Sequence, residues 1–407
     1  MTDLHLPDTD PVSDWAADYD IFDRDYIADP YPIWADLRQH CSVAHSERWG
    51  GSWNPTRYTD VVAMARMVDE LSSAEPTVTP PLRDVPNYGV KAPPITSDPP
   101  DHTWARRLIL PYFSPHVVET DHEPYTRDLC QRLVQGMAGR DVVDGAAEYA
   151  QQIPPRVIAH VLGIDESRVD EFTEWVRGVL EIGLANPQVR LFYRDKLIGF
   201  FQEELAKRKA DPGDDFISQL LRTEHEGEPL SDLHILGTCN LMLIAGIDTT
   251  WSSIGSALWH LATHPDDRHR LQAEPELLPT AVEELLRAYS PVTMARVATQ
   301  DFEYQGCPVH QGDRVLLNFP AANRDPEVFE DAEAVVIDRQ RNRHVAFGVG
   351  IHRCAGSNLA RMEMLVSLRT WLDAFEDFEL VEQGEVTWAG GQVRGPRKLP
   401  LRIRSGA

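Results

Sequence analysis

Apolar residues recur with helical spacing through most of the chain. Between about residues 115 and 290 they return every three or four positions, which is the period of helices that bury one face. Examples of this spacing are Leu162, Val169, Phe172 and Val176. A further helix is predicted from about Ser357 to Phe375. The pattern therefore predicts a mainly helical protein.

The longest apolar stretch without a charged residue runs from Leu233 to Ile247. It contains His234 and Asn240 and is shorter than the ~20 apolar residues that a membrane-spanning helix needs. Apolar positions continue beyond Asp248 toward Thr263. This segment therefore predicts a long buried helix.

Strand patterns become frequent after Pro291. Runs of β-branched and aromatic residues, which favour strands, occur at Val297–Thr299, Phe302–Tyr304 and Arg314–Asn318. The tail, residues 387–403, has the glycine turns of a hairpin. The predicted fold class is mainly α with a minor β portion.

No repeat or linker divides the chain, so we expect a single domain over residues 1–407. Proline and glycine cluster at residues 76–100 and predict a long irregular loop, a kind of segment that is often functional. Residues 1–20 are acidic and predict a loosely ordered arm.

Charge limits the partners that the protein can have. The chain has 39 Lys and Arg against 64 Asp and Glu, a formal net charge of −25. Such a surface repels nucleic-acid phosphates and anionic membranes, so we expect neither as a partner. The first twenty residues contain six aspartates and no Lys or Arg, whereas a secretory signal begins with positive charge. The expected location is the cytoplasm.

The cysteines do not form a disulfide framework. Their number is odd and they lie far apart in the sequence. They are Cys41, Cys130, Cys239, Cys307 and Cys354. No CxxC pair is present, which disfavours a structural zinc site. Four of them are expected to be ordinary buried thiols, and Cys354 lies in the segment with the strongest chemical signal.

That segment is Phe-Gly-Val-Gly-Ile-His-Arg-Cys-Ala-Gly, residues 347–356. A cysteine thiolate is a soft ligand for iron, and on a haem iron it favours O–O bond cleavage. Glycines allow the tight turns that bring backbone close to a flat ligand. The helix predicted directly after the loop favours a thiolate through its N-terminal dipole. The alternative is a glycine loop with a chance buried cysteine.

A second segment, Ala-Gly-Ile-Asp-Thr-Thr at residues 245–250, lies in the long apolar helix. A buried acid is costly unless it has a partner, so Asp248 beside Thr249 suggests a proton-delivery pair. The alternative is a helix end at which both residues act as caps. Because apolar residues continue after Thr250, the helix-end interpretation is disfavoured.

Two further segments are ambiguous by themselves. Glu284 and Arg287 are three residues apart on one helix face, where an exposed ion pair contributes about 0.2–0.5 kcal/mol. His102 and Arg106 are four apart and could both donate to an anion. Taken alone, these residues would more often be solvated surface charges.

Together the four segments identify a family. Residues 347–356 match the FxxGxxxCxG haem-binding signature of the cytochromes P450 at every defined position, and the other three resemble motifs of that family in the same order. The resemblance covers residues from about 30 to 400. It implies the P450 fold, with haem b between the long central helix and the cysteine loop.

Within the loop, the resemblance assigns Cys354 as the thiolate ligand of the haem iron. It implies that Phe347 packs beside the sulfur and that His352 binds a haem propionate. Gly348 and Gly356 are the glycines of the signature.

For the remaining motifs, the resemblance also implies roles. Thr249 would hydrogen-bond iron-bound dioxygen, and Asp248 would connect it to solvent. Glu284, Arg287 and a second arginine would form a buried structural network. Arg339 fits that third position best, and Arg324 and Arg341 are nearby alternatives.

Three more basic residues would bind the haem propionates. They are His102, Arg106 and Arg296.

The family reaction inserts one oxygen atom of O2 into a C–H bond and uses two electrons and two protons. No flavin, nucleotide or iron–sulfur motif is present, so we expect electrons from NAD(P)H through a separate ferredoxin and ferredoxin reductase. A basic docking patch is expected on the thiolate side, with Arg353 and possible contributions from Arg107 and Arg361.

Family position also indicates which residues face the substrate. They are Val78, Val85, Tyr88, Leu180, Ile244, Ala245, Val292, Met294 and Val393. This lining is apolar and suits hydroxylation or O-dealkylation of a small or medium hydrophobic molecule. Arg83, Lys91 and Arg190 could instead recognise a carboxylate, although long cationic side chains in loops more often point to water.

Three other functions remain open. A haem-based sensor would need the cysteine loop but not Asp248 and Thr249, and O2-dependent NADH consumption would distinguish it. A peroxide-driven enzyme of the same fold is disfavoured by that acid–alcohol pair, and turnover with peroxide alone would support it. A helical binding protein without metal would purify colourless.

Overall fold

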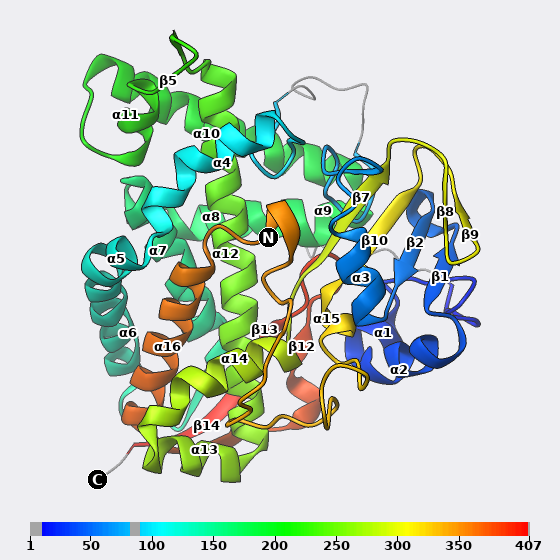
Figure 1. Cartoon of the computed structure of the whole chain (residues 1–407). Coiled ribbons are helices and arrows are strands. Elements are labelled where there is room, and N and C mark those ends of the chain that lie inside the picture. The colour runs from blue at the N-terminus through cyan, green and yellow to red at the C-terminus, as the bar shows by residue number, and fades with distance from the viewer. Residues whose placement is uncertain (1–9, 82–89, 406–407) are drawn as a thin grey trace.

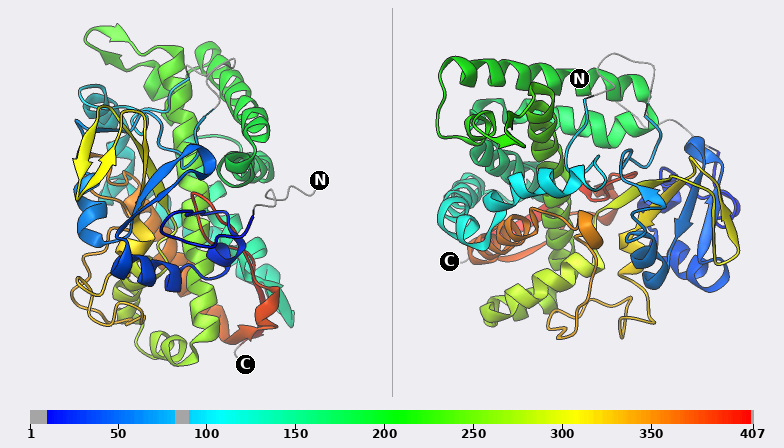
Figure 2. Two further views of the ribbon diagram at one scale, coloured as in Figure 1. Left: turned by 90° about the vertical axis from the view of Figure 1, so that its right-hand side faces the viewer. Right: turned by 45° about the horizontal axis from the view of Figure 1, so that its top comes forward.

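The computed structural model describes residues 10–81 and 90–405. Helices gather on one side around the long α12, and a β-rich part with the first helices lies on the other (Figures 1 and 2). The helices are α1 Arg24–Ala28, α2 Tyr31–His40, α3 Tyr58–Met64, α4 Asp101–Ile109, α5 Pro115–Val117, α6 Glu123–Met137, α7 Ile153–Leu162, α8 Val169–Arg177, α9 Gly183–Ala185, α10 Pro187–Ala210, α11 Phe216–Leu221, α12 Asp232–Thr263, α13 Pro265–Ala273, α14 Leu278–Ala288, α15 Phe319–Ala322 and α16 Ser357–Ala374.

The strands of the described residues are short. They are β1 Val43–Ser46, β2 Ser52–Pro55, β3 Leu71–Ser72, β4 Val142–Asp144, β5 Glu224–His225, β6 Glu228–Pro229, β7 Thr293–Ala298, β8 Phe302–Tyr304, β9 Cys307–Val309, β10 Arg314–Asn318, β11 Phe375–Leu380, β12 Thr387–Trp388, β13 Pro396–Lys398 and β14 Pro400–Ser405. The largest sheet has five strands in the order β1-β2-β10-β7-β3, and a three-stranded sheet has the order β11-β14-β4. The fold is therefore mainly α with a minor β portion, as predicted.

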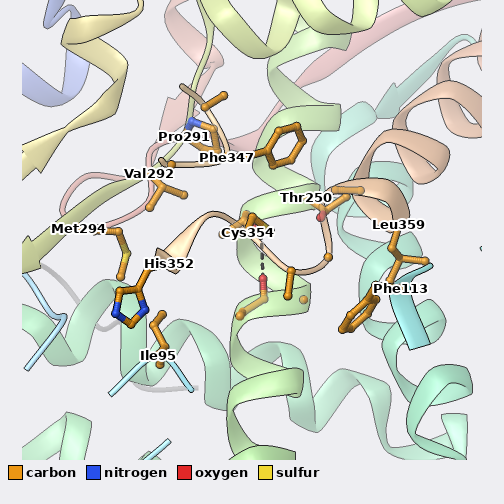
Figure 3. A pocket seen from close by; sticks show the side chains of 18 of the residues that line it. Ile95, Phe113, Thr250, Pro291, Val292, Met294, Phe347, His352, Cys354 and Leu359 are labelled. Carbon is orange, nitrogen blue, oxygen red and sulfur yellow. Dashed lines mark hydrogen bonds between the residues drawn. The ribbon is translucent and has the colours of Figure 1, made fainter. Parts of the chain in front are cut away.

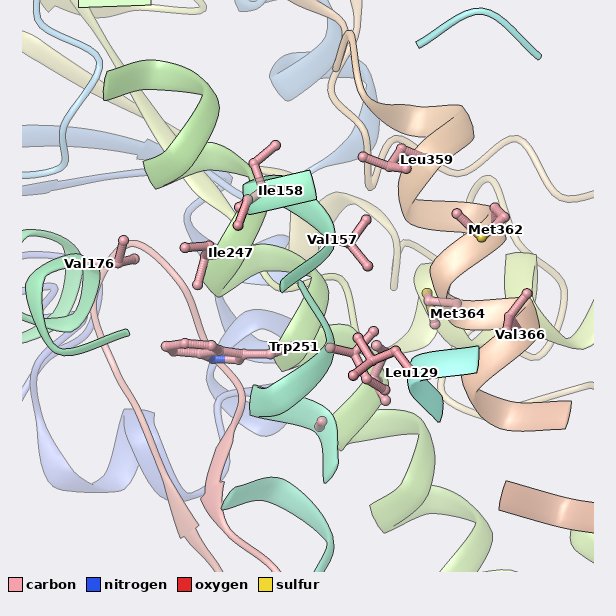
Figure 4. Packing of buried hydrophobic residues seen from close by; sticks show 14 of the residues in the cluster. Leu129, Val157, Ile158, Val176, Ile247, Trp251, Leu359, Met362, Met364 and Val366 are labelled. Atoms are coloured by element: carbon pink, nitrogen blue, oxygen red, sulfur yellow. The ribbon is translucent and has the colours of Figure 1, made fainter. Parts of the chain in front are cut away.

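Helix α12 is the centre of the packing. Its N-terminus is capped by Ser231, whose side chain accepts a hydrogen bond from the His234 backbone N–H, which satisfies one of the free donors of the first turn. Ile247 and Trp251 of α12 are fully buried and pack with α7 and α16 (Figure 4). The main hydrophobic core thus surrounds the helix that carries the acid–alcohol pair.

By length and composition, α12 is the one helix of the described chain that could cross a membrane. However, 61% of its most apolar window is buried inside the protein. Its apolar surface therefore packs in the core, as expected for the segment that begins at Leu233.

The N-terminal segment differs from the loosely ordered arm that the sequence predicted. Residues 1–9 lie outside the described residues, but Tyr19 and Asp20 are buried. Arg48 donates to Asp18 and, at 3.0 Å, to Asp20. The acidic residues of this segment therefore have a cationic partner that lies 28 or more positions away in the chain, and residues 15–20 pack on the β-rich part.

Candidate active site

The cysteine loop is shaped by two glycines with a left-handed backbone. Gly348 has φ 69° and Gly350 has φ 77°, values that a residue with a Cβ adopts only with strain. A Cβ on Gly350 would also come within 3.2 Å of the Ala65 backbone oxygen. The Cys354 backbone N–H donates to the Phe347 carbonyl at 2.7 Å and closes the loop. α16 begins three residues later, at Ser357.

The Cys354 side chain is exposed to a cavity but lies inside the protein, away from the outer surface. This enclosure raises the pKa of the thiol above its usual range. The Gly356 backbone N–H and the nearby Arg106 and Arg353 act in the opposite direction, since they stabilise negative charge on the sulfur.

The cavity has a volume of about 250 Å³ and is mostly lined by apolar side chains. Its walls come from the cysteine loop, α12, α16 and the segment before β7. His352, Met294 and Ile95 lie at one end of it, and Phe113 and Leu359 lie at the other (Figure 3).

Helix α12 presents hydroxyl groups to this cavity. Thr249 and Thr250 both line it. The Thr249 hydroxyl donates to the Ala245 backbone oxygen at 2.9 Å, so its oxygen lone pairs are available to a donor in the cavity. Thr249 and Cys354 therefore meet at the same cavity from different elements.

Asp248 lies outside the cavity lining. Its side chain is fully buried, and its Oδ1 accepts a hydrogen bond from Arg397 Nη2 at 2.8 Å. Burial raises the pKa of this carboxyl to about 6, and the Arg397 charge opposes that rise. The acid and the alcohol of the motif thus project in different directions.

Four basic side chains form a cluster at the end of the cavity where His352 lies. Arg106, Arg296 and His352 line the cavity, and the ring centroids of His102 and His352 are 4.3 Å apart. Burial lowers the pKa of Arg296 to about 10, and burial with the neighbouring cations lowers that of His352 to about 3. His352 is thus neutral near pH 7, whereas Arg296 keeps its charge, and a bound anion would stabilise the cationic forms of both.

The donors of this cluster fit a ligand with two carboxylates. His102 Nε2 is buried and has no hydrogen-bond partner among the described residues. The charge of Asp98 raises the pKa of both His102 and Arg296. Its carboxylate already accepts hydrogen bonds from Ser72 and Ser73. A flat ligand with carboxylates at one edge and a metal at its centre would therefore find anion-binding groups and a cysteine sulfur in one cavity.

Beside the cysteine loop, Glu284 and Arg287 are both fully buried. Both Glu284 oxygens accept from Arg287 at 2.8 Å, and Arg339 Nε donates to Oε2 at 2.9 Å. Asn342 and the Val336 backbone N–H complete the set of donors to Glu284. The structure thus brings Arg339 to Glu284, while Arg324 binds the Ala288 carbonyl instead.

The residues predicted to face the substrate divide into three groups. Ala245, Val292 and Met294 line the cavity, whereas Val85 and Tyr88 lie outside the described residues. The cavity lining does not include Val78, Leu180, Ile244 or Val393.

Those four side chains pack elsewhere. Val78 belongs to the cluster of apolar residues that packs against the N-terminal segment, while Leu180 and Val393 are buried in the main core and Ile244 packs against it. Val393 forms an isolated β-bridge with Val292, so its backbone supports a cavity residue while its own side chain is covered. These four side chains therefore lie outside the lining of the cavity at Cys354.

Sequence reasoning missed Glu283 and Glu363 and the contacts that Arg361 makes. Arg361, expected in a docking patch, makes two hydrogen bonds to Glu283 at 2.5 and 2.8 Å and lies over the Phe347 ring. Burial raises the pKa of Glu283, but Arg361 and His344 outweigh burial and lower it to about 2. Glu363 lines the cavity, and burial raises its pKa well above the usual range. No spacing in the sequence links Glu283 to the cysteine loop.

Comparisons with known proteins define the class of protein to which this cysteine-centred cavity belongs. A family model described as Cytochrome P450 matches residues 186–387. Cytochrome P450 107B1 of Saccharopolyspora erythraea is 32% identical over 395 residues, covering 94% of this chain and 96% of its own length. The mycinamicin IV hydroxylase/epoxidase of Micromonospora griseorubida is 32% identical over 360 residues, covering 86% and 89%.

A solved structure agrees with these relatives. Cytochrome P450 CYP109Q5 from Chondromyces apiculatus has a TM-score of 0.83 at 32% identity, covering 96% of this chain and 99% of its own. The chain belongs to the cytochrome P450 family, and it is a monooxygenase of the bacterial type. Family membership implies a haem that is held by a cysteine thiolate.

Proposed function

We propose that this protein hydroxylates or O-dealkylates a small or medium hydrophobic molecule with one oxygen atom of O2. The observation that carries the proposal is the meeting of Cys354 and Thr249 at one apolar cavity. Cys354 would be the thiolate ligand, while Arg106, Arg296, His102 and His352 would hold the propionates of haem b. When bound, the haem supplies the activation of O2 and the cleavage of its O–O bond.

The protein would contribute geometry and protons. The Gly348 and Gly350 turns hold the sulfur in place. Thr249 donates to Ala245, so its oxygen can accept a hydrogen bond from a group in the cavity and hold that group beside α12. Asp248, adjacent in the helix and with a pKa near 6, is suited to exchange protons near neutral pH.

The cavity supports a hydrophobic substrate. Ala245, Val292 and Met294 line it with Pro94 and Ile95. An apolar molecule entering this space would displace water and gain about 25 cal/mol per Å² of apolar surface buried. We propose no carboxylate-specific site, because Lys91 and Arg190 are absent from the lining and Arg83 lies outside the described residues.

Replacement of Thr249 by alanine tests the oxygen-activation role. We expect NAD(P)H consumption to continue while product formation falls, because reduced oxygen would leave as peroxide or water. The measurement is the ratio of product and peroxide to NAD(P)H consumed. Thr263→Ala, at the end of the same helix, is the control. Fully coupled product formation in Thr249→Ala would remove Thr249 from this role, and efficient turnover with peroxide alone would favour a peroxide-driven enzyme.

The basic cluster gives a test of haem binding. In Arg296→Gln we expect haem to transfer to apomyoglobin about 10- to 150-fold faster, since hydrogen bonds to charged groups contribute about 1.5–3 kcal/mol. Arg404→Gln changes a mostly exposed arginine and should leave the transfer rate unchanged. Equal rates for the two variants would exclude Arg296 as a propionate ligand.

Electrons would come from NAD(P)H through a separate ferredoxin and its reductase, in the cytoplasm. Arg353 and Arg107 are exposed near the cysteine loop and support a basic docking patch, whereas Arg361 is engaged by Glu283. In Arg353→Glu we expect slower reduction of the haem with unchanged haem content. Stopped-flow reduction measures this rate, and unchanged kinetics would contradict the patch.

A further inference from the structure

Asp248 is held in a position that does not suit proton delivery to the cavity. Its Oδ1 accepts hydrogen bonds from Arg397 at 2.8 Å and from Ser252 at 3.3 Å. Its Oδ2 is buried and has no hydrogen-bond partner among the described residues. The carboxyl group is therefore anchored by one oxygen, outside the lining of the cavity that Thr249 faces.

Arg397, on β13, uses every nitrogen of its guanidinium within this buried site. Nη2 donates to Asp248, Nη1 donates to Ser252 at 3.1 Å, and Nε donates to Glu181 at 2.9 Å. Its Cζ lies 5.1 Å from the centroid of the Trp251 ring. The planar fork thus connects two carboxylates through hydrogen bonds in fixed directions.

The backbone next to Arg397 packs closely against α12. A Cβ on Gly395 would come within 2.3 Å of the Ser252 side chain and 2.6 Å of its Cα. A Cβ on Gly255 would come within 2.8 Å of Pro396. Only glycine leaves room at these positions, so the strand and the helix are fixed in register and the guanidinium has little freedom to move away.

Glu181 belongs to the π-helical segment η7, Gly178–Ile182, which follows α8. It accepts hydrogen bonds from Arg177 at 3.1 and 3.2 Å as well as from Arg397. The four side chains form a row of alternating charge that runs from the surface into the core, in the order Arg177, Glu181, Arg397 and Asp248. These are the charged groups that α8, η7 and β13 direct toward Asp248.

The second carboxylate changes what happens when Asp248 moves. A buried arginine with Asp248 as its sole anion would be left uncompensated by any rotation of that carboxylate, which is strongly unfavourable. Because Nε remains on Glu181 and Nη1 on Ser252, the cation keeps partners when Asp248 turns toward Thr249. Release of Asp248 is therefore less costly than its burial alone would suggest.

We propose that Arg397 is a positioning residue for Asp248, and that Glu181 shares Arg397 so that Asp248 can be released to carry protons. Arg397 keeps the carboxylate ionised and turned from the cavity between turnovers. The proposal rests on the proposed proton-delivery role of Asp248 and adds the two residues that control it. Neither residue touches the cavity, so both act through Asp248.

Two substitutions should shift the pKa of Asp248 in opposite directions. In Arg397→Gln the carboxylate loses its cation, and its pKa should rise by about 1–3 units. In Glu181→Gln a neighbouring anion is lost and Arg397 is left to Asp248 alone, so the pKa should fall. A purely structural role would lower thermal stability or haem content in both variants without moving the titration in opposite directions.

The titration is measured on the haem-loaded protein by infrared difference spectra between pH 5 and pH 8, with Asp248→Asn used to identify the Asp248 band. The pH profile of coupled product formation is the second readout. Arg402→Gln, on neighbouring strand β14, is the matched control and should leave both unchanged. Opposite shifts support the proposal, and absent or parallel shifts overturn it.

The experiments distinguish failure of the proposed proton role of Asp248 from failure of the inference about Arg397. If Asp248→Asn forms product with full coupling, Asp248 is not the proton carrier, although the infrared shifts would still report how Arg397 holds it. If Asp248→Asn uncouples turnover and the infrared band does not move in the other variants, the inference about Arg397 fails alone. Should Arg397→Gln not retain haem, Arg397→Lys replaces it. A lysine keeps the charge but cannot donate to all three acceptors, so the weaker contact with Asp248 should give a smaller rise of its pKa, and a fall or no change would overturn the proposal.

Discussion

Substrate oxidation is expected to fall to background when Cys354 is replaced by serine, while most of the fold survives. The cysteine side chain opens on the cavity, so the change removes little core packing. A serine hydroxyl does not supply the electron density that a thiolate gives to haem iron. The first measurement is the absorption spectrum of the reduced protein with carbon monoxide, in which the red-shifted Soret band of the family should be lost.

The matched control for that experiment is Cys307→Ser. Cys307 is a partly exposed free thiol on β9, away from the cavity lining, and its replacement should leave the band and the product yield unchanged. Retention of the red-shifted band in Cys354→Ser would mean that another residue ligates the iron, and the assignment of the cavity would have to change.

The largest loss of stability is expected from Glu284→Ala. Glu284 is fully buried and accepts hydrogen bonds from Arg287 and Arg339. Removing it would leave two cations in the interior without their anion, and breaking such a buried pair costs about 3–5 kcal/mol. Because a domain is stable by only about 5–15 kcal/mol, we expect a marked fall in the free energy of unfolding and poor haem retention.

Urea unfolding followed by circular dichroism measures this loss. Glu123→Ala on α6 is the control, since Glu123 pairs with Arg127 four residues away at the surface, where such pairs contribute about 0.3–0.5 kcal/mol. A loss below about 1 kcal/mol for Glu284→Ala, comparable with that of the control, would show that Arg287 and Arg339 find other anionic partners.

Local patterns predicted the helices well because each depends on neighbouring residues. The helical spacing and the position after the glycine loop placed a helix from Ser357 to about Phe375, and α16 runs from Ser357 to Ala374. Likewise, the apolar run after Leu233 predicted the long helix α12, Asp232–Thr263. Hydrophobic periodicity and capping act within one turn or two, so the sequence contains this information directly.

Long-range partners could not be predicted in the same way. Arg397 lies 149 residues from Asp248, and no spacing rule connects a tail strand with a central helix. The same holds for Glu283 and Arg361, which are 78 residues apart in the sequence. Their ion pair engages an arginine that was expected in the docking patch. Arg339 was placed beside Glu284 only through a resemblance to a family, not through any property of residues 336–341.

Four of the residues that family position places at the substrate, Val78, Leu180, Ile244 and Val393, lie outside the lining of the cavity at Cys354. Val78, Leu180 and Val393 are apolar, as a pocket residue should be, but apolar residues are equally suited to the core. Which side of an element faces the cavity depends on packing around α12. Ala245 and Val292, in contrast, lie within or beside motifs whose position in the fold was already fixed.

The fit of Gly395 against Ser252, and of Gly255 against Pro396, limits how this chain can be recombined with its relatives. A chimera that takes residues 395–397 from one parent and residues 248–255 from another would combine two surfaces that were not shaped together. Any side chain larger than hydrogen at position 395 would meet the Ser252 atoms at 2.3–2.6 Å. Breakpoints for shuffled libraries should therefore keep these two short segments, far apart in sequence, from the same parent.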